Sequence, residues 1–109
     1  MRDFLIVGAL FFASSAFAAD VNMGHSNYIA RCQSCHGTTG NGDGPAARAL
    51  PKPPRSFATP EFWVGMTDER LASTITNGKP GSAMRGFPMD DKQREDLIAY
   101  LNTLRPAAK

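Results

Sequence analysis

The chain has 109 residues and a formal net charge of +2, with 42% apolar and 20% charged residues. This balance excludes a polyelectrolyte tail, a collagen-like repeat and a low-complexity disordered chain. The length fits one small domain.

The N-terminal residues have the order of a secretory signal. A short polar start precedes the apolar stretch from Phe4 to Phe12, and Ala16-Phe17-Ala18 has the small-x-small pattern of a cleavage site. The apolar run is shorter than the about 20 residues that span a membrane, although an uncleaved anchor is the main alternative. We therefore expect a signal peptide at 1–18, cleaved after Ala18. A single domain at 19–109 would then be exported to a bacterial periplasm and would not be inserted in the membrane.

The first helix is expected from about Val21 to Cys35, with Asp20 or Asn22 as its cap. Cys32, Cys35 and His36 at its end form C-x-x-C-H, the pattern of c-type haem attachment. Residues at these spacings share one face of a helix, so both thiols and the imidazole point the same way. The thiols can then form thioethers with one haem, and the imidazole can ligate its iron.

Other functions of the two cysteines fit the sequence less well. A disulfide would not require His36, and a thioredoxin-like redox pair needs a βαβ pattern that is absent around this motif. A zinc site needs four ligands, and the only other histidine is His25. The exported domain contains few apolar side chains for its size, so a large cofactor would also supply the missing core.

With this motif, the chain resembles the small monohaem cytochromes c of class I, which carry an N-terminal haem site. Further matches flank the motif: Gly24, Tyr28, Gly37 and residues 98–101. The resemblance runs from about residue 24 to 104 and implies an all-α, cytochrome c-like fold. Three to four short helices and long Gly/Pro-rich loops would wrap one covalent haem c. The resemblance also implies that Gly24 lets the first and last helices cross closely, with Tyr100 packed there; a frayed helix start is the alternative.

Glycines and prolines interrupt the chain throughout residues 37–60, which predicts an irregular loop. A loop of this length needs something to wrap around, and a haem edge would serve. A short helical turn is expected at 45–50, with Pro45 near its start. In the family, a proline at this spacing offers its carbonyl to the ligand histidine, so the resemblance implies that Pro45 orients His36. An ordinary turn proline is the alternative.

Two more helices are expected in the second half of the chain. Thr67 and the two acids after it predict a helix start, and Asn77-Gly78 predicts its end. The last helix begins with Asp90 as its cap and Gln93 as a possible capping-box partner. The apolar spacing predicts these core residues: Leu71, Ile75, Leu97, Ile98, Leu101 and Leu104. No segment has the pattern of a strand.

The second axial position of the iron decides between two kinds of function. A methionine there makes an electron carrier of raised potential, whereas an open position binds gases or peroxide. Met84 and Met89 lie between the last two helices, in a loop that can cross the distal face of a haem. The resemblance of residues 77–84 to the axial-ligand loop of the family favours Met84. Met89 is the alternative, or it packs against the last helix; His25 is a weaker candidate.

Haem propionates require N–H donors or charged partners. Trp63 and Arg55 are the candidates that we assign to this haem environment, together with Pro45 beside His36. Other cations of the same kind are Arg48, Lys52 and Arg85, although solvated surface charge is the usual role of such residues.

These features predict a soluble periplasmic one-electron carrier, a monomer that changes no substrate and is therefore not an enzyme. Its expected partners are a redox donor and acceptor among membrane or periplasmic oxidoreductases, and not a nucleic acid. One alternative is a haem enzyme or sensor with an open sixth position, such as a small peroxidase or gas binder. Another is a haem subunit of a larger periplasmic oxidoreductase.

Overall fold

The computed structural model of the protein describes residues 18–107 and Gly8, so most of the predicted signal peptide lies outside the described residues. Helices are the only regular structure in residues 18–107, which confirms the all-α prediction. They are α1 (Val21–Arg31), α2 (Gln33–His36), the 3-10 helix η1 (Pro45–Ala49), α3 (Pro60–Trp63), α4 (Asp68–Asn77) and α5 (Asp91–Thr103). Over this described part, no helix combines the length and the apolar character that crossing a membrane requires.

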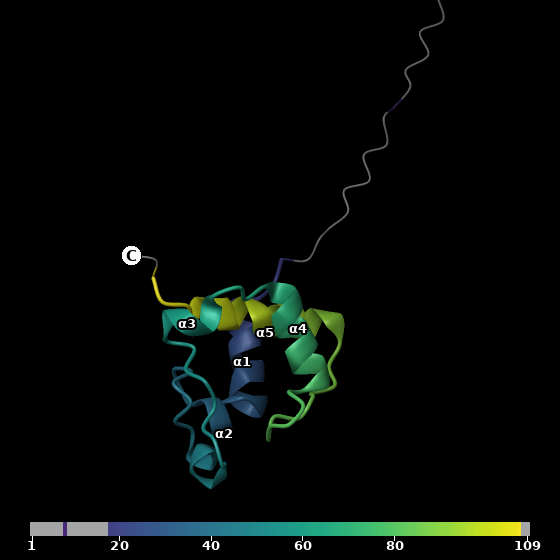
Figure 1. Ribbon diagram of the computed structural model, residues 1–109. Helices are drawn as coiled ribbons and strands as arrows, with labels where there is room; N and C mark the ends of the chain where they lie inside the picture. The colour runs from purple at the N-terminus through teal and green to yellow at the C-terminus, as the bar shows by residue number, and fades with distance from the viewer. Residues whose placement is uncertain (1–7, 9–17, 108–109) are drawn as a thin grey trace, which may run out of the picture.

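The crossing of α1 and α5 organises the fold (Figure 1). Gly24 is buried at this crossing. A Cβ atom there would lie 1.9 Å from the Asp96 carbonyl oxygen and 3.0 Å from the Tyr100 Cβ atom. The predicted close approach at Gly24 and Tyr100 is therefore confirmed, because any larger side chain would push the two helices apart.

Side chains cap the three long helices where the sequence predicts their starts. Asp20 accepts hydrogen bonds from the backbone amides of residues 22 and 23, and Thr67 caps α4. Asp90 accepts from the Gln93 backbone amide at 2.7 Å, while the Gln93 side chain accepts from the Asp90 amide at 3.1 Å. These reciprocal bonds form the predicted capping box, which satisfies amides that have no partner within the helix.

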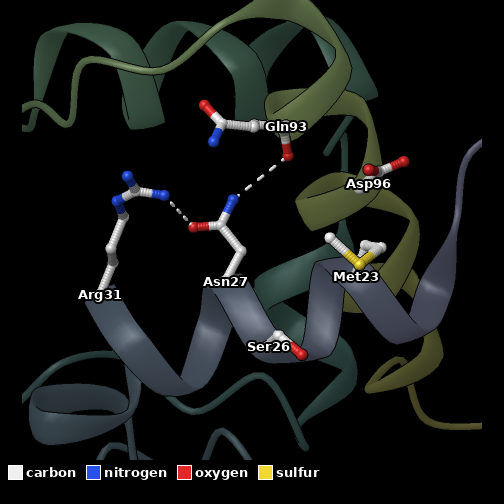
Figure 2. Close-up of a pocket in the computed structure, with 6 residues that line it drawn as sticks. All are labelled: Met23, Ser26, Asn27, Arg31, Gln93 and Asp96. Atoms are coloured by element: carbon white, nitrogen blue, oxygen red, sulfur yellow. Dashed lines mark hydrogen bonds between the residues drawn. The ribbon is translucent and has the colours of Figure 1, made fainter.

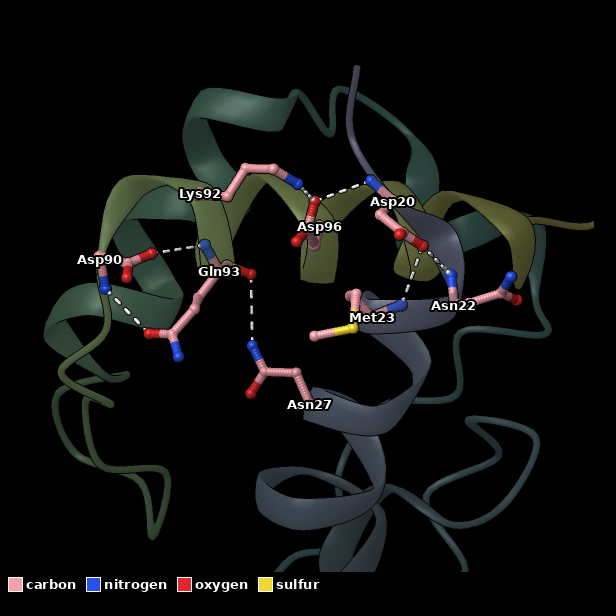
Figure 3. Close-up of polar contacts among 8 residues, drawn as sticks. All are labelled: Asp20, Asn22, Met23, Asn27, Asp90, Lys92, Gln93 and Asp96. Carbon is pink, nitrogen blue, oxygen red and sulfur yellow. Dashed lines mark hydrogen bonds and ion pairs between the residues drawn. The ribbon is translucent and has the colours of Figure 1, made fainter. Parts of the chain in front are cut away.

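A buried carboxylate ties the start of α1 to the middle of α5 (Figure 3). Asp96 is only 5% exposed, and its Oδ1 atom accepts a 2.7 Å hydrogen bond from the Asp20 backbone amide. Lys92 forms an ion pair with the same oxygen. The backbone hydrogen bond and the lysine together hold the pKa of this carboxyl below its usual value.

The core lies between α1, α4 and α5 and extends to α3. Its buried members are Tyr28, Phe57, Trp63, Leu71, Ile75, Leu97, Ile98 and Leu101. All predicted core residues are present except that Leu104 is only partly buried and packs against this cluster. Phe57, from the irregular loop, is a core residue that the apolar spacing of helices does not reveal.

Two elements differ from the sequence prediction. The expected helix from Val21 to Cys35 is two helices, because α1 ends at Arg31 and Cys32 has φ −118°. This φ lies far from the value of about −63° in a regular helix, and α2 begins directly after Cys32. The second difference is α3, a single turn that the sequence did not predict; it begins at Pro60, where the segment expected to be irregular ends.

Candidate functional site

The C-x-x-C-H sequence lies at the junction of α1 and α2 (Figure 1). The Cys32 amide donates to the Tyr28 carbonyl at 2.8 Å, and the His36 amide donates to the Cys32 carbonyl at 2.9 Å. Both cysteines are free thiols and are partly exposed. The backbone therefore holds the two thiols and the imidazole within little more than one helical turn.

The protonation state of Cys32 distinguishes this motif from a redox-active pair. Burial raises the pKa of its thiol to about 11, and the positive charge of Arg31 offsets only part of that effect. The thiol is therefore protonated at neutral pH, whereas thioredoxin-like pairs depend on a cysteine of lowered pKa. Free, half-buried thiols beside a histidine fit covalent haem attachment better than thiol–disulfide exchange.

The two nitrogens of the His36 imidazole have different surroundings. Its Nδ1 atom is buried and has no hydrogen-bond partner among the described residues. Its ring stacks on Phe57 with the centroids 4.7 Å apart and an angle of 20° between the planes. Burial lowers the pKa of His36, and a neutral imidazole is the form that ligates a metal. With Nδ1 inside the protein, Nε2 is the nitrogen left for an iron.

The predicted contact between His36 and Pro45 is not among the hydrogen bonds that the described residues make, and Nδ1 has no other partner. Pro45 begins η1 and is exposed. The unpartnered Nδ1 atom would still gain from a carbonyl acceptor, so the role of Pro45 stays a prediction.

The irregular loop after the motif is fastened to α2 through its backbone. The Gly42 amide donates to the His36 carbonyl at 2.8 Å, and the Gly44 amide donates to the Cys35 carbonyl at 3.1 Å. A third bond comes from α1, because the fully buried Tyr28 hydroxyl donates to the Gly37 carbonyl at 2.6 Å. These bonds fix the position of His36 relative to both the helix before it and the loop after it.

Met84 lies in a loop that folds back onto the end of α4. The Lys79 amide donates to the Met84 carbonyl at 3.0 Å, and the Phe87 amide donates to the Ile75 carbonyl at 2.8 Å. Gly78 has φ +73°, and a Cβ atom there would lie 2.7 Å from the Met84 carbonyl oxygen. The backbone of Met84 is thus held on both sides, and its half-buried side chain is not part of the core cluster.

Met89, the alternative ligand, takes part in helix packing. It packs against the core cluster, and its sulfur atom accepts a hydrogen bond from the Asn27 side chain at 3.8 Å. Its carbonyl accepts from the Arg94 guanidinium at 2.9 Å. These contacts join Met89 to α1 and α5, as expected for a residue that packs at the start of the last helix.

Trp63, the predicted propionate donor, is part of the core. Its indole N–H donates to the Phe57 carbonyl at 2.8 Å, and the side chain is a buried core residue. The indole N–H is thus used within the fold in this structure, and its role toward a haem propionate stays a prediction. Arg55 is exposed; its guanidinium donates to the Glu61 carbonyl at 3.3 Å and lies 5.1 Å from the centre of the Phe62 ring.

Two small grooves lie near the motif, and neither is bordered by its cysteines or by Met84. One has a volume of about 230 Å³ and lies between α1 and α5, where Arg31, Asn27 and Gln93 are linked by hydrogen bonds (Figure 2). The other has a volume of about 220 Å³ and includes Pro45 in its lining. Since the Asn27 side chain already donates across the first groove to the Gln93 backbone carbonyl, this groove shows helix packing and not a ligand site.

The available donors fit haem c better than a bare metal ion. No group of three or more His, Cys, Asp or Glu side chains that could hold a metal occurs in the part of the chain that the structure describes. A single neutral imidazole and two free thiols on one turn match a covalently attached porphyrin, which supplies the remaining iron ligands itself. The sequence analysis did not predict the contact between Phe57 and the His36 ring. The one sequence feature that pointed to it was an isolated aromatic residue within a Gly/Pro-rich loop.

The family and a curated relative agree with this interpretation of the site. The cytochrome c family matches residues 21–105. Cytochrome c-552 of Bradyrhizobium diazoefficiens (strain USDA 110) is 33% identical over 104 residues, which cover 94% of this chain and 91% of that protein.

Solved structures show the same fold both alone and within larger chains. A chain of the Kuenenia stuttgartiensis reducing HAO-like protein complex Kustc0457/Kustc0458 has a TM-score of 0.65 at 29% identity, over 76% of this chain and 41% of that chain. The KustC0563 c-type cytochrome has a TM-score of 0.64 at 26% identity, over 75% and 96%. Dihydro-heme d1 dehydrogenase NirN in complex with DHE has a TM-score of 0.56 at 27% identity, over 80% and 17%. The chain thus spans about two fifths of the first of these proteins and nearly all of the second.

Proposed function

This chain belongs to the cytochrome c family and is a haem c electron carrier, and on that premise we propose that it is a soluble periplasmic one-electron carrier with His36 and Met84 as axial iron ligands. The observation that carries this proposal is the C-x-x-C-H sequence at the junction of α1 and α2, within a helical fold of this family. The signal sequence predicted at residues 1–18 supports the periplasmic location.

In this proposal, Cys32 and Cys35 attach the haem and His36 holds the iron from the proximal side. Their support is the sequence spacing, the free thiols and the neutral imidazole whose Nδ1 atom is buried. The stacked Phe57 ring limits rotation of the imidazole, and the loop bonds to the carbonyls of residues 35 and 36 hold the motif in place. A carbonyl acceptor from Pro45 would further orient the ring.

Met84 completes the proposed ligand set. It is held by the folded-back loop at the end of α4, whereas Met89 packs between α1 and α5. A loop fixed at both ends by helices can present a thioether without a large rearrangement between redox states. Bound haem c supplies the iron that accepts and returns one electron.

A second candidate is a haem subunit of a larger redox assembly. The similarity to parts of longer chains, including one from a complex and one dehydrogenase, favours it. In that case the same residues would hold the same haem, and a permanent partner would replace transient ones. Size-exclusion chromatography of the protein at its native concentration separates a free carrier, a monomer, from such a subunit.

Visible spectroscopy of two matched variants tests the ligand set. The oxidised protein should show the long-wavelength band of methionine–iron ligation, and Met84→Ala should abolish it while the covalent haem is retained. Met89→Ala is the control and should keep the band, because Met89 packs against α1 and α5. A band that survives Met84→Ala, or immediate cyanide binding by the oxidised wild-type protein, would contradict the proposal.

A further inference from the structure

A row of aromatic rings leads from His36 to the side chains of α3. The His36 and Phe57 ring centres are 4.7 Å apart, and the Phe57 and Phe62 ring centres are also 4.7 Å apart. Phe62 continues to Trp63 at 5.0 Å. All three separations are within the range of direct aromatic contact. The proposed iron ligand is therefore connected by ring-to-ring contact to a helix at the surface.

Two exposed arginines contact the α3 end of this row. The Arg55 guanidinium lies 5.1 Å from the centre of the Phe62 ring, and the Arg105 guanidinium lies 4.9 Å from the centre of the Trp63 ring. Both distances are typical of cation–π contacts. Neither arginine is in an ion pair with an acidic side chain among the described residues. Their positive charges are therefore available to a partner.

An exposed apolar residue ends the same helix whose rings the two arginines contact. Val64 follows Trp63 at the end of α3 and is 77% exposed, more than any other large apolar side chain that the structure describes. An apolar residue with charged neighbours is typical of a protein contact surface. We call Arg55, Val64 and Arg105 the α3 surface.

We propose that the α3 surface is a docking site for the anionic face of a redox protein, and that Phe62 and Phe57 couple this site to His36. The coupling part of this inference rests on the proposed role of His36 as an iron ligand. One electron passes between the docked protein and the haem protein in each encounter. No ring is oxidised, no bond forms or breaks, and no proton is transferred.

The chemistry of the partner follows from the charges and the apolar centre of this surface. Arginine and aromatic side chains are enriched where protein interfaces bind strongly. Guanidinium groups without an acidic partner attract a carboxylate-rich surface and orient it during the encounter. Glu61 on α3 carries a negative charge. It repels any acidic group of the partner that lies directly opposite it, and this repulsion helps to orient the partner.

Binding of a redox-inert anion maps the proposed docking site. Hexacyanocobaltate(III) can be titrated into the oxidised, ¹⁵N-labelled holoprotein while amide and indole signals are followed by NMR. Trp63 is the only tryptophan of the chain, so its indole signal is unique. We expect the shifts to concentrate at Trp63, Val64 and their neighbours, and to be lost in Arg55→Glu and Arg105→Glu. Shifts centred on the loop between α4 and α5 would overturn the proposal.

Charge reversal tests whether the same surface is used in electron transfer. With hexacyanoferrate(III) as the oxidant, Arg55→Glu and Arg105→Glu should each slow oxidation about two- to fivefold at low ionic strength, and salt should remove the difference. Lys79→Glu is the matched control, since Lys79 is exposed on the α4–α5 loop, away from α3 (Figure 1). A larger effect of Lys79→Glu would show docking at another surface and would refute the inference.

Phe62→Leu tests the coupling separately from the docking. It keeps an apolar side chain but removes the ring between Phe57 and Trp63. We expect slower electron transfer that salt does not restore, with the visible spectrum, the reduction potential and the hexacyanocobaltate shifts unchanged. An unchanged rate would refute the coupling role. If the purified protein lacks covalent haem, the proposed function fails instead, and the spectrum shows this before any variant is made.

Discussion

The closest approach between α1 and α5 makes Gly24→Ala a sensitive test of the fold. The new Cβ atom would meet the Asp96 carbonyl oxygen at 1.9 Å and its carbon at 2.5 Å, whereas ordinary contacts begin at 3.4 Å. The obstructing atoms are backbone atoms, which cannot move aside as a flexible side chain can. The two helices must therefore separate over the region where Asp96 and Tyr100 pack.

The expected size of the effect comes from two opposing contributions. Alanine is favoured over glycine inside a helix by about 1 kcal/mol. Overpacking of a well-packed core costs about 1–3 kcal/mol, and occasionally more; here the clash is with backbone on a buried face, so we expect the upper end. The net loss of about 2 kcal/mol corresponds to a fall in Tm of roughly 8–16 °C for a domain of this size.

Circular dichroism of the holoprotein during heating measures this difference. Ser26→Ala is the matched control, because Ser26 is exposed on the same helix and its hydroxyl makes one long bond of 3.3 Å to the Asn22 carbonyl. We expect its Tm to stay within a few degrees of that of the wild type. If Gly24→Ala melts at the same temperature as the wild type or higher, the close crossing of the two helices is wrong.

Three further variants test single contacts. Tyr28→Phe removes the buried 2.6 Å hydrogen bond to the Gly37 carbonyl and should lower the free energy of unfolding by about 1–3 kcal/mol in guanidinium titrations; no loss would mean that the carbonyl finds another partner. Asp90→Ala removes the capping box of α5 and should cost about 1 kcal/mol by the same measurement, and a neutral result would contradict its role. The lowered pKa of Asp96 means that its contribution is complete above its unfolded pKa of about 3.9 and is lost as the pH falls through its lower folded pKa. The difference in melting temperature between Asp96→Asn and the wild type should therefore shrink below about pH 4; a difference that grows on acidification would reverse this sign.

Much of the helical framework is determined locally and was predictable. Asp20, Thr67 and Asp90 cap helices because their side chains reach amides only a few residues away. Gly78 ends α4 with a positive φ of 73°, a conformation that depends little on the rest of the protein. The spacing of the C-x-x-C-H motif is local in the same sense, because the cysteines and the histidine are close in sequence.

Only the tertiary structure shows which residues from distant segments contact one another. The sequence left Met89 as an alternative to Met84, and only the packed chain shows that Met89 contacts Asn27 on α1. The hydrogen bond from the Trp63 indole N–H to the Phe57 carbonyl likewise joins residues that the sequence does not show to be partners. The stacking of Phe57 on His36 also joins residues from different elements.

The physical reason is the range of the interactions. Caps, helix ends and the haem motif depend on neighbours within about one helical turn, and the amino-acid sequence states them directly. The partner of a buried N–H, the ring that covers an imidazole and the surface formed by Arg55, Val64 and Arg105 exist only when the packed chain brings distant residues together. The amino-acid sequence by itself does not state which of these distant residues lie close together in space.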